Sequence, residues 1–143
     1  MRSLFCRLVA AGALAGVALT VVADAPAVPF MPFVDCAASR AYQLYVLKNS
    51  GEAEAGELKE TESHIQFYLQ IAESLSERSL RKEFLKASER EKQKAEKLIK
   101  AGGSEAYLAY DASRRKECSS LVKIHQEEIM KAADRLYDDQ QKR

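Results

Sequence analysis

Side chains that carry out catalysis or bind metals are scarce in this sequence of 143 residues. It has only two histidines and three cysteines, and no two cysteines are close in sequence. Covalent haem attachment needs a Cys-x-x-Cys-His motif and is therefore excluded. No serine lies in a nucleophile-elbow motif, and no glycine-rich loop follows a strand pattern. We therefore expect a non-enzymatic protein with no catalytic residues, no metal site and no cofactor.

The first residues have the three parts of a secretory signal peptide. Arg2 and Arg7 flank the start of the chain, an uncharged run extends from Leu8 to Ala23, and small residues and prolines follow. This run is shorter than the roughly 20 residues of a membrane helix. We therefore expect cleavage after Ala23, with an uncleaved membrane anchor as the alternative. The run is rich in Ala, Gly and Val, which favours a bacterial protein exported to the periplasm.

The chain left after cleavage at Ala23 is expected to form one domain. It keeps 120 residues, enough for a modest core, with 20 basic and 21 acidic residues. This balance does not favour nucleic acid as a partner. The three prolines all lie between Pro26 and Pro32, so we expect residues 24–34 to be extended and the helical domain to cover residues 35–143.

Two cysteines, Cys36 and Cys118, remain after the predicted cleavage. An even pair of cysteines in an oxidising compartment is expected to form a disulfide. Closing a loop of about 80 residues stabilises the fold by on the order of 4 kcal/mol in the chain-entropy account. The alternative is a pair of free thiols, with Cys36 made reactive by its position at a helix N-terminus.

Apolar residues recur at spacings of three and four through the rest of the chain, which predicts helices and no strand. Asp35, Ser79 and Ser104 are the expected N-caps. The junction between the second and third helices contains no Gly or Pro, so these two could instead form one continuous helix. We predict a small all-α, four-helix bundle with one disulfide. The expected helices cover residues 35–48, 57–78, 79–101 and 104–138.

The two cysteines fit this arrangement if the first and fourth helices are antiparallel neighbours. Cys36 lies at the start of the first helix, which has about 14 residues, and Cys118 lies 14 residues after Ser104. The fourth helix would then continue for about 20 residues beyond Cys118. Apolar residues near the start of the first helix are expected to cover the exposed flank of the fourth helix: Phe30, Met31, Phe33 and Val34.

The two histidines are the remaining candidates for a metal or ligand site. Glu60 and His64 are four residues apart, so they share one helix face and could bind a metal ion together. The same spacing is typical of two solvent-exposed side chains that interact on a helix surface. His125 shares a face with Cys118 and Val122, so a buried ring there would need a hydrogen-bond partner. We expect His125 to be a histidine at the core edge, bonded to a carboxylate or a carbonyl, with a ligand or a pH sensor as the alternative.

Four tyrosines are expected near one end of the bundle: Tyr42, Tyr45, Tyr107 and Tyr110. Tyrosine is enriched at protein-binding surfaces, although it is also common at the edge of a small core. We therefore predict an exported interaction module of the bacterial envelope, of the chaperone, inhibitor or immunity type. Its partner would be an unidentified envelope protein or peptide, bound through these tyrosines. The alternative function is a metal or small-molecule carrier that uses His125 or His64.

Overall fold

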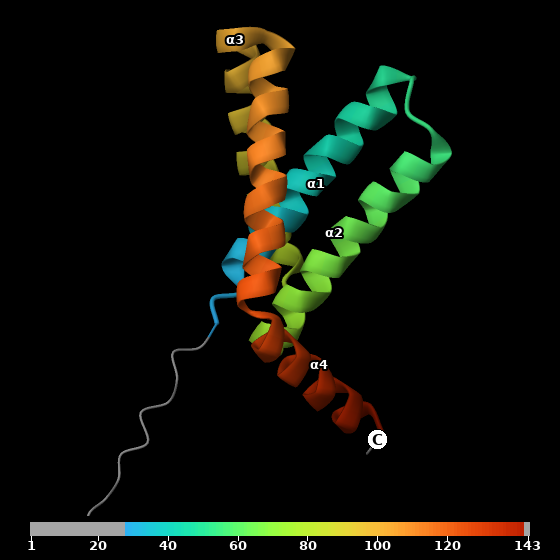
Figure 1. The fold of residues 1–143 in the computed structure, drawn as a ribbon, viewed down its shortest axis with the longest axis vertical. Helices are drawn as coiled ribbons and strands as arrows, with labels where there is room; N and C mark the ends of the chain where they lie inside the picture. Colours follow the sequence, from blue (N-terminus) through green and yellow to red (C-terminus); the bar gives the residue numbers. More distant parts are fainter. Residues whose placement is uncertain (1–27, 142–143) are drawn as a thin grey trace, which may run out of the picture.

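The computed structural model describes residues 28–141, so the predicted signal peptide and its cleavage site lie outside the described range (Figure 1). Within that range the chain is helical and contains no strand, which confirms the all-α prediction. None of its helices has the length and apolar composition that crossing a membrane requires. The four helices are α1 (Met31–Ser50), α2 (Ala55–Ser76), α3 (Arg81–Ile124) and α4 (Gln126–Gln141).

Helix α1 begins four residues earlier than predicted. Phe30 is at the N-cap position and Pro32 lies in the first turn, where a proline is tolerated because that turn's N–H groups have no partner within the helix. Asp35 is therefore inside α1 rather than at its N-cap, and the expected extended conformation is wrong for residues 31–34. The helix ends where predicted, since Gly51 adopts a left-handed conformation with φ 71°.

Helices α2 and α3 are separate, although no glycine or proline divides them. Glu77 takes a left-handed conformation with φ 55° directly after α2. A carboxylate oxygen of Glu73 accepts the backbone N–H of Leu80 at 2.9 Å, which supplies a partner for one of the free amides near the start of α3. Leu80, rather than the predicted Ser79, is at the N-cap position of α3.

Helix α3 is a hairpin of two arms, which we call the first arm (residues 81–102) and the second arm (residues 104–124). The turn is at Gly103, whose φ of 72° and ψ of −170° fall in a region that essentially only glycine adopts. A Cβ atom on Gly102 would lie 2.8 Å from the Cβ of Ala106. Both glycines are therefore required, as the predicted stop at this position implied.

The predicted fourth helix is not continuous to residue 138. It ends at Ile124, and His125 leaves the helical conformation with φ −106° and ψ 21°. The backbone N–H of His125 still donates to Leu121 O at 3.2 Å, and its own carbonyl accepts from Ile129 N at 3.0 Å. The chain bends here, and α4 points away from the rest of the molecule (Figure 1).

The helices form an open bundle with α1 at its centre. Helix α1 packs on α2 and on the α3 hairpin, and the other backbone neighbour of α2 is α4. Helix α4 contacts α2 and the α3 hairpin, so every helix has two neighbours, and the predicted all-α bundle is confirmed. Above its base the molecule separates into two limbs, the α1–α2 pair and the α3 hairpin (Figure 1).

The main core lies at the base, where α1, α2 and the start of α3 meet. Phe33, Val34 and Leu80 are fully buried there, and Phe30 and Met31 pack against them from the edge. The sequence predicts these residues as a cover on the flank of the helix that contains Cys118. Leu121 and Val122 of that helix do pack against this cluster, but Phe33 and Val34 are part of the core itself. A second, smaller cluster of Tyr42, Ala95 and Tyr107 lies higher, between α1 and the α3 hairpin.

Candidate functional site

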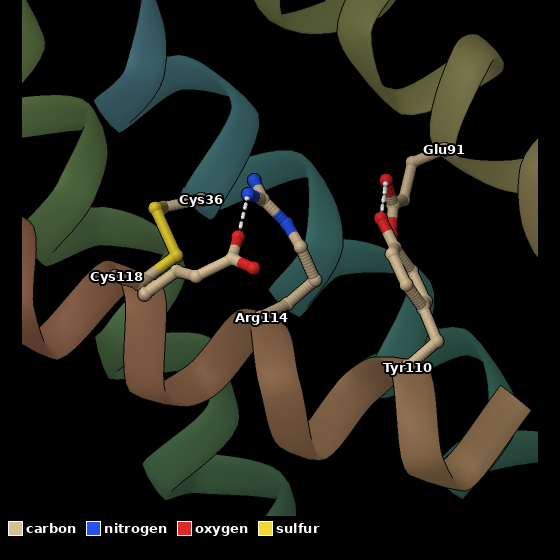
Figure 2. The surroundings of a disulfide bond; sticks show 6 residues. Cys36, Glu91, Tyr110, Arg114 and Cys118 are labelled. Atoms are coloured by element: carbon tan, nitrogen blue, oxygen red, sulfur yellow. Dashed lines mark hydrogen bonds and ion pairs between the residues drawn. A yellow bond between two sulfur atoms is a disulfide. The ribbon is translucent and has the colours of Figure 1, made fainter.

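A disulfide joins α1 to the second arm of α3, which confirms the predicted pairing (Figure 2). The Cα atoms of Cys36 and Cys118 are 5.8 Å apart, and both side chains are buried in the main core. Disulfides are typical of proteins that fold in oxidising compartments. The bond fixes the base of α1 against α3 and leaves the upper part of α1 held by non-covalent packing alone.

Charged side chains continue along the second arm beside the disulfide. The Arg114 Nη1 donates to Glu117 Oε2 at 2.7 Å (Figure 2), and this hydrogen bond lowers the pKa of the Glu117 carboxyl. The hydroxyl of Tyr110 donates to Glu91 Oε2 at 2.9 Å. Because Glu91 belongs to the first arm, this bond ties the two arms together. Burial, followed by the hydrogen bond to Glu91, raises the pKa of Tyr110.

The four predicted tyrosines do not form one exposed surface. Tyr42 and Tyr107 are buried and meet edge to face, with ring centroids 5.3 Å apart, so the core explanation holds for these two. Burial raises the pKa of the Tyr107 hydroxyl. Tyr110 is half-buried in its hydrogen bond. Only Tyr45, which is 58% exposed, is available to a partner over most of its side chain.

Tyr45 lies on the wall of a groove between α1 and the first arm of α3. The groove has a volume of about 350 Å³, and its opposite wall carries Leu85, which is 59% exposed. Two large apolar side chains thus face solvent across one concavity, an arrangement that is common at binding sites. The residues that line the α1–α3 groove are Ala41, Tyr42, Tyr45, Leu85, Ser88, Glu89 and Lys92.

The groove also offers polar groups. The Ser88 Oγ is buried and has no hydrogen-bond partner among the described residues, and a buried hydroxyl normally has one. Glu89 and Lys92 add one charge of each sign to the lining. A ligand with an apolar side chain and a hydrogen-bonding backbone would complement both parts of this groove.

Sequence reasoning missed the first-arm half of the groove. Leu85 is 59% exposed on the groove wall, whereas its neighbour Phe84 packs on the main core. Adjacent helix residues point about 100° apart, so one of them can face the core while the other faces the groove. The consecutive pair of large apolar residues was the available signal.

The two histidines lie apart from this groove. His64 is on α2, and His125 is at the bend between α3 and α4, where its ring meets the edge of Phe33 at a centroid distance of 6.4 Å. Across residues 28–141 no three His, Cys, Asp or Glu side chains gather closely enough to hold a metal ion. The predicted carrier function therefore has no group of ligands assembled around either histidine in the described range.

Comparisons with protein-family models, with curated proteins and with solved structures found no match to this chain. The function of this chain is therefore inferred from the geometry of the groove, the disulfide and the charges around them.

Proposed function

We propose that this chain is an exported, non-enzymatic interaction module that binds a protein or peptide segment in the α1–α3 groove. The observation that carries the proposal is the pair of exposed apolar side chains, Tyr45 and Leu85, facing each other across a concavity. Apolar side chains that line a concavity together with a few polar groups are typical of binding sites. In the bacterial envelope such a module would act as a chaperone, an inhibitor or an immunity protein.

The apolar contact supplies part of the free energy that binding requires. The exposed parts of Tyr45 and Leu85 amount to roughly 200 Å² of side-chain surface, so covering both contributes on the order of 5 kcal/mol before the costs of association. The buried Ser88 Oγ has no partner among the described residues, and a turn of its side chain toward the groove would let it bond to the ligand backbone, which adds orientation as well as free energy. A short segment with one or two apolar side chains fits these requirements.

Export is supported by the disulfide and by the pattern of the first 23 residues. The buried Cys36–Cys118 bond suits an oxidising compartment, and the basic start with its uncharged run suits a cleaved signal peptide. We therefore expect the protein recovered from the periplasm to begin near Asp24. Mass spectrometry of the intact protein, with and without reductant, tests the cleavage and the bond together.

The binding function is tested by capture with the oxidised, mature protein. Captured proteins should be lost when Tyr45→Ala and Leu85→Ser are introduced into the groove. Phe67→Ser is the matched control, because Phe67 is also an exposed aromatic residue, 44% exposed, but lies on α2 outside the groove. A partner retained equally by all three variants would show that binding uses a different surface.

A further inference from the structure

A second large apolar surface lies on α4. Met130 is 58% exposed and Tyr137 is 63% exposed, and Ala133 lies exposed between them along the helix. The adjacent face of α4 is occupied, since Ala132 is buried and Ile129 packs against the main core. Helix α4 is thus amphipathic with an apolar stripe wider than its own contact with the molecule. We call the exposed part, Met130, Ala133 and Tyr137, the α4 stripe.

The α4 stripe and the α1–α3 groove cannot meet within one molecule. The bend at His125 directs α4 away from the two limbs, whereas the groove lies between α1 and α3 higher in the molecule (Figure 1). Each surface therefore remains uncovered in a single chain. Both surfaces belong to the same sequence, so a second copy always presents the missing counterpart.

The charges around the two surfaces are opposite. The first arm of α3 has eight basic residues against four acidic ones, and α4 has five acidic residues against two basic ones. Lys92 lines the groove, and Asp134 lies between Met130 and Tyr137 in the α4 sequence. Among the described residues neither Lys92 nor Asp134 forms an ion pair. Opposite potentials favour the approach of α4 to the first arm and fix its position there.

The dimensions of the two surfaces also agree. Met130 and Tyr137 are seven residues apart, as are Leu85 and Lys92, so each pair spans about 10 Å along its helix. We propose that α4 of a second copy of this chain docks in the α1–α3 groove, with the α4 stripe between Tyr45 and Leu85 and with Asp134 toward Lys92. This inference rests on the proposed function, because it assigns an occupant to the same groove.

Such docking is reciprocal and closes a dimer. In a two-fold arrangement α4 of each copy enters the groove of the other, so one contact occurs twice and no surface is left for further growth. The dimer covers the groove in both copies. Self-association therefore competes with the binding of another partner, and the protein concentration sets how many grooves are open.

The mass of the oxidised, mature protein in solution tests the proposal. Sedimentation equilibrium from about 1 to about 200 μM is expected to show a monomer that converts to a dimer with rising concentration. Leu85→Glu in the groove and Met130→Glu on α4 should each weaken dimerisation at least tenfold. Both residues are exposed, so the variants should fold, which circular dichroism checks. Phe67→Glu is the matched control and should dimerise like the wild type.

A mixture of the two variants separates this arrangement from others. The Leu85→Glu chain keeps an intact α4, and the Met130→Glu chain keeps an intact groove, so an equal mixture restores one of the two contacts. We expect the mixture to dimerise more strongly than either variant alone. Likewise, Lys92→Glu and Asp134→Lys should each weaken the dimer, and the double variant should recover part of the loss.

Three outcomes would overturn the proposal. A monomeric mass up to the highest concentration would exclude the dimer. Loss of dimer with Met130→Glu but not with Leu85→Glu would indicate pairing of α4 with α4, and a mixture no stronger than its components would exclude reciprocal docking. The capture experiment tests the proposed function independently of the dimer. A monomer that captures a partner through Tyr45 and Leu85 would contradict only the dimer, and a reciprocal dimer whose groove captures nothing would contradict only the proposed function.

Discussion

Replacing Tyr107 and Tyr110 by phenylalanine is expected to change stability in opposite directions at pH 7. The buried hydroxyl of Tyr107 has no hydrogen-bond partner among the described residues, so Tyr107→Phe removes an unsatisfied polar group and keeps the ring contact with Tyr42. An unsatisfied buried group costs about 1–3 kcal/mol. We therefore expect the free energy of unfolding to stay level or to rise by about 1 kcal/mol.

Tyr110→Phe is the matched comparison, because it removes a hydroxyl that does have a partner. The bond from Tyr110 to Glu91 is a hydrogen bond to a charged acceptor, which is stronger than one between neutral groups. Since the ring is half-buried and water can replace part of the bond, we expect a loss of about 1–2 kcal/mol. The same chemical change thus gives opposite results at positions three residues apart.

The pKa of Tyr107 adds a second, independent signature above pH 10. Burial raises this pKa in the folded state, whereas an unfolded tyrosine titrates near its ordinary value of about 10. Between these two values the unfolded chain has lost a proton that the folded chain keeps, so the free energy of unfolding falls as pH rises, by about 1.4 kcal/mol per pH unit. At pH 11 the contribution of Tyr107 to this fall is about 1.4 kcal/mol.

Urea denaturation followed by circular dichroism, at pH 7 and at pH 11, measures all of these effects. Relative to the wild type, Tyr107→Phe should gain about 1.4 kcal/mol between the two pH values. If Tyr107→Phe is as damaging as Tyr110→Phe at pH 7, the Tyr107 hydroxyl has a partner and the reasoning is refuted. An unchanged difference between pH 7 and pH 11 would refute the raised pKa.

Three further substitutions test the covalent and backbone features of the fold in the same urea assay. Replacing both Cys36 and Cys118 by alanine should lower the free energy of unfolding by about 4–5 kcal/mol, because their separation of 82 residues closes a long loop in the unfolded chain; the loss should match that caused by reductant in the wild type. Gly103→Ala should cost about 1–3 kcal/mol, since alanine does not tolerate the φ and ψ at the α3 turn, and a neutral result would show that the turn can relax. Glu77→Gly should instead stabilise by about 0.5–1 kcal/mol, since glycine adopts the left-handed conformation without strain, and a loss would show that the Glu77 side chain matters more than its backbone.

The helix boundaries that could be predicted are those where one residue dictates the local conformation. Gly51 and the Gly102–Gly103 pair end their helices because a left-handed or sterically crowded backbone there requires glycine. The breaks at Glu77 and His125 have no such signal. Glu77 is held in a left-handed conformation while Leu80 is buried, so tertiary packing overrides local preference.

The candidate site was predictable to the extent that it depends on helix geometry. The pairing of Cys36 with Cys118 was predicted from the even number of cysteines left after the expected cleavage, and the rise per residue of two antiparallel helices showed that the two residues can come level. The α1–α3 groove depends instead on the angle at which α1 crosses the first arm, which no spacing in the sequence specifies. That angle buries Tyr42 and leaves Tyr45 exposed, although the two are neighbours on one helix.

The Cys36–Cys118 bond also acts as a pivot for the limb that α1 carries. Above the main core no backbone contact joins α2 to α3, so there α1 provides the packing between that limb and the hairpin, and its covalent attachment is near one of its ends. Tyr45 is nine residues from the pivot, or about 13 Å along the helix. A rotation of about 10° at the disulfide moves Tyr45 by about 2 Å, enough to change the groove from one that admits a side chain to one that excludes it.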